Sequence, residues 1–330
     1  MSKVIYIEKQ CEDDVKAKAF MAQYPNADII TCDHYKSVFN PKSYQNFRLQ
    51  KQKPAFIIAN KQGVRVHPTP ETFGIGSHNN YYFSHLLNCP YDCRYCFLQG
   101  MYPSAHYVWF VNYQDYMQDI KAIAKTNNNS YFFSGYDGDS LALNKQTKFL
   151  EYFVPFFQGL NDAKMELRTK SALVEPLMQF EASEHIVCAF SLSPELIIKH
   201  TEHRTASLEK RLQAIKKCAD HGWPIGLRFD PVIYFHHYEQ AYQDLIEQVL
   251  SVVPKDRIHS ISVGPMRFPK DYFVTMKKLY PEEPLFSQYF ENNGNVLTYP
   301  KDIEQAITQA VIQPLLESGI SEKLLFRCYA

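Results

Sequence analysis

The chain has 330 residues, of which 45% are hydrophobic and 15% aromatic, and its 35 basic residues balance its 35 acidic ones. This composition excludes a disordered chain and provides no net charge that would attract nucleic acid to the whole surface. The charged start MSKVIYIEKQCEDD and the lack of a run of about 18 apolar residues predict a cytoplasmic protein without a secretion signal or a membrane span.

Residues 1–76 are predicted to form a small α/β unit. Two short apolar runs, VIYI and AFIIAN, have the composition of strands and flank a helical segment. We expect this unit to be an extension that precedes the main domain.

From residue 77 onward, short runs of β-branched and aromatic residues alternate with longer helical patterns. This alternation is typical of βαβ units that build a parallel sheet. The predicted strands are Asn80–Ser84, Ser130–Ser134, Met165–Thr169, Ile186–Leu192, Pro224–Phe229 and Ser260–Val263. The predicted helices are Tyr113–Lys125, Lys145–Phe157, Ser207–His221 and Tyr238–Val252. Six β–α steps over residues 77–267 predict an α/β fold, a partial parallel (β/α)6 barrel.

Residues 268–330 are predicted to form a C-terminal extension of a hairpin and a helix. The dipeptide Asn293-Gly294 marks the turn of a hairpin over Phe286–Tyr299. A helix over Asp302–Ser318 and a last strand over Leu324–Tyr329 are expected to follow.

Reactive side chains gather at the carboxyl ends of the predicted strands. Three cysteines follow the first strand, Gly135 and Asp139 follow the second, Lys170 ends the third and Ser191 ends the fourth. Loops at this end of a parallel barrel converge on one face, where catalytic groups lie. The sequence therefore places a candidate active site there.

Cys89, Cys93 and Cys96 form a CxxxCxxC pattern within the stretch NCPYDCRYCFLQG. Eight cysteines are too few for a disulfide scaffold in a chain of this length, so a group of three indicates a metal or catalytic site. Three interpretations are open: buried apolar thiols, a zinc site with His85 or another residue as fourth ligand, or a 4Fe-4S cluster with one iron open to an exogenous ligand. Three cysteines are one ligand short of a closed four-thiolate site. The missing ligand favours the cluster, because its open iron could bind S-adenosylmethionine (SAM), which carries radical chemistry with iron–sulfur partners.

The cysteine pattern, with an aromatic residue before its third cysteine and a position after the first barrel strand, resembles the radical SAM superfamily. The stretches CRYCFLQG, RTKS, FSLSPELIIKHTEHRTASLEKRL and TYPKD are similar, in this order, to the spore photoproduct lyase family. The resemblance implies a radical SAM barrel with a 4Fe-4S cluster that cleaves SAM reductively to a 5′-deoxyadenosyl radical. It also implies repair of a crosslinked thymine pair, so the expected partners are lesion-containing DNA and an electron donor such as flavodoxin or ferredoxin.

The same resemblance assigns roles to single residues. The three cysteines match the cluster ligands, and Lys170 matches a lysine that pairs with the SAM carboxylate. Ser191 matches a serine that contacts SAM, and Asp139 falls where the family has an acidic residue beyond the second strand. Gly135 begins that loop and is a cofactor-binding candidate with it. Tyr95 matches a catalytic tyrosine that relays a hydrogen atom.

Each role has a purely structural alternative. Lys170 could be a solvated lysine that closes its strand, and Ser191 could be a hydroxyl satisfied by local backbone. Asp139 could cap a helix that begins before Leu141. Tyr95 could pack over the cluster without reacting.

The chain departs from the family at three places. Tyr136 stands where the family has its hydrogen-donating cysteine, and Phe97 stands where it has a second relay tyrosine. The hairpin tip reads ENNG at residues 291–294 and lacks the family's basic–aromatic pair. We predict that Tyr136 is a catalytic candidate that lines the substrate pocket. Strand alternation turns Cys188 toward the outer helices, so Cys328 is the remaining cysteine that could approach the barrel interior.

Three functional hypotheses follow from these observations. The first is a lyase that acts on a DNA lesion. The second is hydrogen abstraction by the same radical from another substrate, such as a modified RNA or a peptide. The third is a nucleic-acid-binding module whose cluster is only structural.

Overall fold

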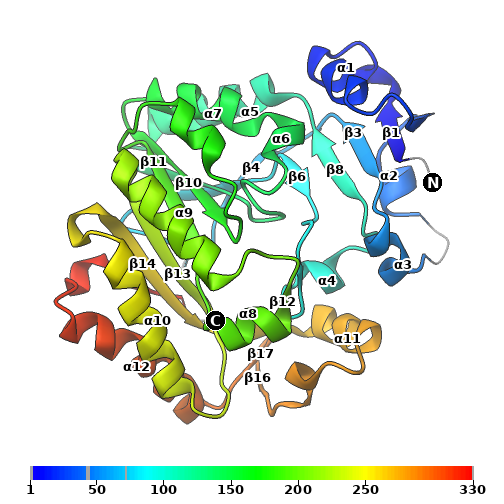
Figure 1. The fold of residues 1–330 in the computed structure, drawn as a ribbon. Coiled ribbons are helices and arrows are strands. Elements are labelled where there is room, and N and C mark those ends of the chain that lie inside the picture. The colour runs from blue at the N-terminus through cyan, green and yellow to red at the C-terminus, as the bar shows by residue number, and fades with distance from the viewer. Residues whose placement is uncertain (1–2, 42–44, 71–72, 329–330) are drawn as a thin grey trace.

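The structure is a computed structural model that describes residues 3–41, 45–70 and 73–328. Its centre is a curved sheet with the order β18-β14-β13-β11-β10-β9-β5-β4, in which all neighbouring strands are parallel except β4 and β5 (Figure 1). The strands are β4 (Val66–Pro68), β5 (Asn80–Phe83), β9 (Ser130–Ser134), β10 (Ala163–Thr169), β11 (Ile186–Ser191), β13 (Ile225–Val232), β14 (Ile258–Pro265) and β18 (Leu325–Arg327).

The partial parallel barrel predicted from the sequence is confirmed. Its six predicted strands correspond to β5, β9, β10, β11, β13 and β14. The predicted last strand corresponds to β18, although its predicted end at Tyr329 lies outside the described residues. Strand β4 was not predicted, and it occupies the sheet edge, where Pro68 is tolerated because an edge strand need not donate every backbone N–H.

Helices cover the outer face of this sheet (Figure 1). They are α5 (Tyr113–Thr126), α6 (Asn144–Thr147), α7 (Phe149–Gln158), α8 (Glu195–Thr201), α9 (Leu208–His221) and α10 (Tyr238–Val252). Ser207 caps α9 by accepting the Lys210 N–H, and Gly222 ends it with φ of 101°. The single helix predicted over Lys145–Phe157 is wrong, because Lys148 adopts φ of 55° and separates α6 from α7.

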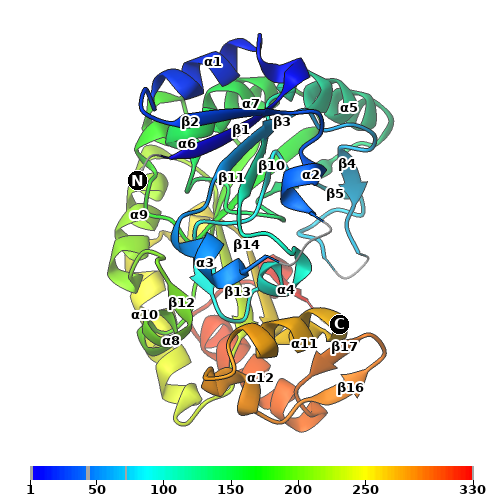
Figure 2. The same cartoon turned by 90° about the vertical axis from the view of Figure 1, so that its right-hand side faces the viewer.

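A second sheet, with the order β2-β1-β3-β8-β6, lies beside the barrel (Figure 2). The two predicted N-terminal strands correspond to β1 (Val4–Glu8) and β3 (Phe56–Ala59). Strand β2 was missed, and the later strands β6 and β8 join the sheet from beyond residue 76. The remaining elements are β2 (Asp28–Cys32), β6 (Leu86–Leu87), β8 (Tyr107–Phe110), α1 (Val15–Ala22), α2 (Lys36–Phe39) and α3 (Phe47–Gln52). The N-terminal region therefore shares its sheet with the segment around the cysteines.

The C-terminal region contains the predicted hairpin and helix. Strands β16 (Glu291–Asn293) and β17 (Val296–Thr298) pair antiparallel, and Gly294 adopts φ of 58° in the turn between them. Strand β15 (Arg267–Pro269) completes this sheet. Helix α11 (Lys270–Leu279) follows β15, and α12 (Lys301–Glu317) packs against α10.

A buried ion pair ties the barrel strands together from the inside. Arg228 on β13 donates to Glu166 on β10 at 2.7 Å and to Ser260 on β14 at 2.8 Å, and neither charged side chain is exposed to solvent. The Arg168 Nε donates to the same carboxylate at 2.8 Å. Apolar side chains from the sheets and helices form the surrounding core. Within the described part of the chain, no helix is long and apolar enough to cross a membrane.

Candidate active site

The predicted cluster ligands lie on the cysteine loop, which we define as residues 88–97. The loop runs from β6 to the short helix α4 (Leu98–Met101) and contains β7 (Asp92–Cys93). Strand β7 pairs antiparallel with β12 (Glu202–His203), which places Cys93 opposite Glu202. The loop is therefore held by a segment that follows α8 and is distant in sequence.

Asn88 fixes the start of the cysteine loop. Its φ of 69° lies in the left-handed region, which asparagine tolerates better than most residues. Its side-chain amide donates to the carbonyl oxygens of Ser104 at 2.8 Å and His106 at 2.7 Å. These bonds join the loop to the chain that follows α4.

The three thiols fit an iron–sulfur cluster. Burial raises the pKa of Cys89, Cys93 and Cys96, and at Cys89 the nearby Asp139, Cys93 and Cys96 raise it further. Three thiolates in one half-buried loop are therefore unfavourable alone and would be stabilised by cationic irons, because metal binding releases their protons. Each thiolate of a cluster binds its own iron, so the sulfur atoms need not converge on one point.

The zinc interpretation finds no support in the described residues. Among them, no three or more His, Cys, Asp or Glu side chains are arranged to hold a single metal ion. His85, the suggested fourth ligand, stacks on Phe149 with ring centroids 3.9 Å apart and planes 7° apart. Burial lowers the pKa of His85 to about 3. His85 is a neutral core residue in this fold.

Tyr95 belongs to a buried polar network that the sequence did not reveal. The Tyr95 hydroxyl donates to the Glu202 carboxylate, and the Ser193 hydroxyl donates to the same carboxylate oxygen at 2.9 Å. Arg211 on α9 pairs with the other carboxylate oxygen, and both charged side chains are fully buried. Arg211 also donates to the Ser191 carbonyl at 2.9 Å. The network fixes the cysteine loop against the end of β11.

The charge of Glu202 is stabilised within this network. Burial alone would raise the pKa of Glu202, but Arg211 and Lys170 more than offset it and hold the pKa below its ordinary value. Both Glu202 and Arg211 lie in the stretch FSLSPELIIKHTEHRTASLEKRL that carried the family resemblance. Sequence similarity therefore contained the signal, but it did not show that the two residues form a pair.

Lys170 is directed toward the cysteine loop from the end of β10. Its Nζ lies 5.5 Å from the centroid of the Tyr95 ring. Burial lowers the pKa of Lys170, and Cys93 and Glu202 reverse this effect, so that the pKa is raised overall. The structure thus places a half-buried, protonated ammonium group beside two of the predicted cluster ligands, Cys93 and Cys96.

Asp139 positions the backbone at the end of β10. One carboxylate oxygen accepts the N–H groups of Leu141 at 3.0 Å and Ala142 at 2.9 Å and the Thr169 hydroxyl at 2.8 Å. The other accepts the Lys170 N–H at 2.7 Å. Asp139 therefore holds the turn over residues 140–143 and does not cap a helix, because α6 begins only at Asn144. It also fixes the residue that carries the ammonium group.

Gly135 begins the same loop, at the carboxyl end of β9. Its φ is 83°, and a Cβ placed there would lie 2.7 Å from the Ser140 Oγ and 3.0 Å from the Arg168 carbonyl oxygen. Only glycine fits this turn without displacing its neighbours. Ser191, the other predicted cofactor-binding residue, is buried at the carboxyl end of β11.

Tyr136 and Phe97, two of the positions at which this chain departs from the family, lie close together in the structure. The rings of Tyr136 and Phe97 are 5.9 Å apart, and Tyr136 stacks on Tyr82 at 4.1 Å with an angle of 23°. Phe97 in turn stacks on Tyr272 of α11 at 6.4 Å. We call Tyr82, Tyr136, Phe97 and Tyr272 the aromatic row. Tyr136 is 37% exposed and is not packed among the outer helices.

Cys188 and Cys328 lie outside the cysteine loop. The Cys188 thiol on β11 is hydrogen-bonded to Cys218 on α9, so it faces the outer layer as predicted. Cys328 follows β18 and is buried, and burial raises its pKa to about 11, with Asp230 and Arg168 among the charged groups around it. Cys328 is therefore a protonated thiol near barrel side chains.

The hairpin tip carries exposed acidic and amide side chains, and the nearest strand supplies a cation. Residues 291–293 of β16 are exposed. Arg267 of β15 donates to Asp230 at 3.5 Å, to the Pro265 carbonyl at 3.1 Å and to the Cys328 carbonyl at 3.2 Å, in each case through Nη1. A guanidinium group thus stands between the C-terminal sheet and the barrel.

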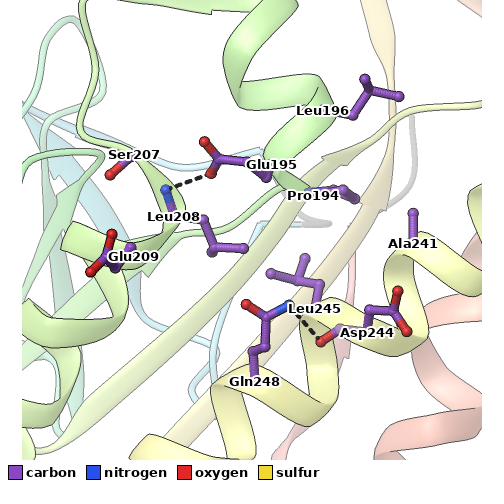
Figure 3. Close-up of a pocket in the computed structure, with 10 residues that line it drawn as sticks. All are labelled: Pro194, Glu195, Leu196, Ser207, Leu208, Glu209, Ala241, Asp244, Leu245 and Gln248. Carbon is purple, nitrogen blue, oxygen red and sulfur yellow. Dashed lines mark hydrogen bonds between the residues drawn. The ribbon is translucent and has the colours of Figure 1, made fainter.

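A hollow of about 430 Å³ lies elsewhere, between the outer helices α8, α9 and α10 (Figure 3). Its polar side chains serve the helices themselves: the Glu195 carboxylate accepts the Leu208 N–H at 2.9 Å, and Gln248 donates to the Asp244 carbonyl at 3.1 Å. None of the predicted site residues lines it. The hollow is separate from the candidate active site.

Comparison with known proteins identifies consistent relatives. A family model described as spore photoproduct lyase matches residues 1–292. The spore photoproduct lyase of Bacillus subtilis (strain 168) is 25% identical over 235 residues, covering 68% of this chain and 69% of that protein. A solved spore photoproduct lyase mutant with bound AdoMet and dinucleoside spore photoproduct has a TM-score of 0.84 at 16% identity, covering 100% of this chain and 98% of the other. A further one, complexed with dinucleoside spore photoproduct, has a TM-score of 0.79 at 17% identity, covering 100% and 99%. These similarities show the same radical SAM barrel fold.

Proposed function

The chain belongs to the spore photoproduct lyase family of radical SAM enzymes, and we propose that it splits a crosslinked thymine pair in DNA. The family's cofactors are a 4Fe-4S cluster and SAM, and when bound they supply a 5′-deoxyadenosyl radical that takes a hydrogen atom from the substrate. The structural relatives bind a dinucleoside spore photoproduct, which supports a thymine lesion as the substrate class here.

The placement of Lys170 beside the cysteine loop supports this proposal most directly. Cys89, Cys93 and Cys96 would hold the cluster, and the Lys170 ammonium would bind the SAM carboxylate as a point charge. Tyr95, through its hydrogen bond to Glu202, would keep the loop in register with Lys170. The loop and its cation therefore form one preorganised unit.

The other candidate residues have graded roles in the proposal. Ser191, at the neighbouring strand end, would contact SAM. Asp139 already has four hydrogen-bond donors within the protein, so it would act through the Lys170 backbone. Gly135 would act by giving that loop its path close to β10. Asp139 and Gly135 are thus positioning residues for the cofactor site.

Tyr136 is the candidate hydrogen donor at the barrel mouth. Burial raises its pKa, as do Tyr82 and Asp137, so the phenol keeps its proton at neutral pH. A neutral phenol can give up the hydrogen atom of its hydroxyl group, whereas Phe97 has none to give. Cys328 is the alternative thiol, and it is buried.

The remaining partners follow from the reaction. Reductive SAM cleavage needs a one-electron donor of the flavodoxin or ferredoxin class, which would act in the cytoplasm. Lesion-containing DNA would approach the side where β4, β5, α4 and α11 lie (Figure 2). We divide the chain into residues 1–76, 77–267 and 268–330. The central barrel would carry out the SAM chemistry, and all three parts would contact the substrate.

The deciding experiment is anaerobic reconstitution with iron and sulfide, followed by SAM, dithionite and a short oligonucleotide that carries the crosslinked thymine pair. Release of repaired thymines would support the lyase. SAM cleavage without any change to the lesion would favour hydrogen abstraction from an RNA or peptide substrate. Failure to cleave SAM with an intact cluster would favour a binding module with a structural cluster.

A further inference from the structure

The aromatic row lies at the barrel mouth, and its rings are not fully buried in the core. Tyr136 is 37% exposed, and Tyr82, Phe97 and Tyr272 are only partly buried. The Tyr82 and Tyr136 planes lie within 23° of each other, as do those of Phe97 and Tyr272. Large aromatic side chains that remain accessible in one connected group indicate a binding surface, because folding alone would bury them.

The row spans several elements and passes beside the predicted cofactor site. Tyr82 lies on β5, Tyr136 follows β9, Phe97 ends the cysteine loop and Tyr272 lies on α11. Figure 2 shows α4 between the β4–β5 hairpin and α11, with all of them on one side of the molecule. Phe97 is adjacent in sequence to Cys96. A flat ligand on the row would therefore lie next to the predicted cofactor site.

The loop that carries Tyr136 is fixed by hydrogen bonds of a buried neighbouring residue. The neighbouring Asp137 carboxylate is buried and accepts hydrogen bonds from the Ser84 hydroxyl and from the Tyr102 hydroxyl at 3.2 Å. These bonds hold the loop at Asp137. The Tyr136 ring itself contacts the rings of Tyr82 and Phe97. The ring face is thus preorganised, which lowers the entropy lost on binding.

A cation stands close to the row. Arg267 lies on β15, which leads directly into α11, the helix that carries Tyr272, and its charge lowers the pKa of Tyr136 against the effect of burial. Its Cζ is also 4.9 Å from the centroid of the Phe73 ring. All three hydrogen bonds of Arg267 to described residues use Nη1, and its side chain, paired with Asp230, is 15% exposed. A guanidinium has further N–H groups that can bind a phosphate oxygen. Aromatic faces beside a guanidinium match the bases and phosphates of a single nucleic-acid strand.

We propose that the aromatic row is a stacking surface for a nucleobase of the DNA substrate, with the Tyr136 ring as its exposed face and Arg267 as the contact for the adjoining phosphate. The inference rests on the proposed function and deepens it. Tyr136 then adds an aromatic ring where the family has a cysteine, whereas Phe97 keeps the ring of the family's tyrosine and lacks only its hydroxyl. This role depends on the ring and is independent of hydrogen donation by the hydroxyl.

Binding without turnover tests the surface. Fluorescence anisotropy would follow a fluorescein-labelled oligothymidylate titrated with cluster-loaded protein, in the absence of SAM and reductant. Tyr136→Leu should weaken binding on the order of tenfold, because stacking on one aromatic ring contributes about 1–3 kcal/mol per base. Tyr136→Phe keeps the ring and should stay within about twofold of wild type. Tyr152→Leu is the matched control, since Tyr152 lies on α7 against Tyr113 and outside the row.

A spectroscopic signal separates stacking from affinity. An oligonucleotide with one 2-aminopurine should lose fluorescence when its base stacks on the row, and saturating Tyr136→Leu should restore part of the signal. Phe97→Leu provides the same test if Tyr136→Leu does not fold, as judged by circular dichroism and iron content. Arg267→Gln should weaken binding and reduce its salt dependence.

Each outcome has one meaning. Wild-type binding that Tyr136→Leu and Phe97→Leu leave unchanged would overturn the stacking surface while leaving the lyase proposal intact. Equal weakening by Tyr136→Phe and Tyr136→Leu would assign the contact to the hydroxyl and overturn the role of the ring. If wild type binds neither oligothymidylate nor lesion-containing oligonucleotide, the DNA substrate itself is wrong, and the surface is rejected together with it.

Discussion

The two sides of the barrel mouth hold their side chains in different ways. On the side of β10, β11 and β12, the charges of Glu202 and Arg211 are fully buried and paired, and Lys170 is held beside them. On the side of β5 and β9, the aromatic row is joined by ring contacts and stays partly exposed. A buried ion pair tolerates few replacements, whereas a stacked ring can be exchanged without leaving an unpaired charge. This chain departs from its family at Tyr136 and Phe97, on the aromatic side.

The largest expected effect concerns the cluster on the ion-paired side. Anaerobically reconstituted protein should bind about four irons and four sulfides per chain, and Cys93→Ala should lose them, because one thiolate fewer leaves the cluster with only two protein ligands. Iron and sulfide analysis with the visible absorption spectrum would measure this. A single tightly held zinc without sulfide, in protein purified without oxygen, would contradict it.

The buried pair beneath the cysteine loop should be the next most sensitive site. Arg211→Met leaves the Glu202 charge buried without its partner and should lower the free energy of unfolding by about 3–5 kcal/mol. The matched control is Arg228→Met, which breaks the equally buried pair with Glu166 inside the barrel. Chemical denaturation should show similar losses for both variants, but only Arg211→Met should also weaken cluster retention. If both variants retain the cluster equally well, the Glu202–Arg211 pair has no specific role in holding the cysteine loop.

Lys170 should affect the cofactor and not the fold. Lys170→Ala should keep the cluster and weaken SAM binding by about 1–3 kcal/mol, the range for a hydrogen bond to a charged group. Calorimetric titration of cluster-loaded protein with SAM would measure it, and Lys164→Ala, on the strand that leads to Lys170, is the control. Unchanged SAM affinity would return Lys170 to a structural role.

His85 predicts a loss of stability in mild acid. Its folded pKa is lowered to about 3, whereas the unfolded chain takes up the proton near the ordinary value of 6.5. Below pH 6.5 the unfolded state therefore binds more protons, and stability falls as the pH decreases, with His85 alone contributing about 2 kcal/mol between pH 7 and 5. His259, whose pKa is lowered to about 4, adds a further loss in the same range. The pKa of Glu166 is lowered to about 2, so its contribution is lost only below about pH 4.5 and leaves this window unaffected. Denaturation at both pH values should show that His85→Phe removes the His85 share, and a slope unchanged in that variant would contradict it.

Tyr136 should produce the smallest effect on the fold and a specific effect on products. If its hydroxyl donates hydrogen, Tyr136→Phe should shift products toward uncoupled 5′-deoxyadenosine, and Tyr136→Cys should improve coupling on a thymine lesion. Product analysis by chromatography and mass spectrometry would measure the ratio. Clean processing by the Phe variant would move the donor elsewhere, with Cys328 as the next thiol to substitute.

The sequence by itself determined the barrel and predicted the three cysteines as ligands of the site. Periodic apolar runs fix strands and helices locally, so β9 over Ser130–Ser134 and α10 over Tyr238–Val252 match their predictions to the residue. The CxxxCxxC spacing is also local, because all three thiols lie on one loop. Family similarity added Lys170 and Tyr95 to this list.

Only the tertiary structure decided which distant residues meet. Glu202 opposes Cys93 because β12 pairs with β7, and no local pattern encodes that pairing. Lys148 separates α6 from α7 although the sequence pattern there is continuously helical. The spacing of apolar residues does not reveal a single residue in the left-handed conformation. The contacts of Tyr82, Tyr136 and Phe97 depend on the parallel pairing of β5 with β9 and on the path of the cysteine loop. Through-space neighbours of this kind follow from how the sheets close, which composition and spacing leave undetermined.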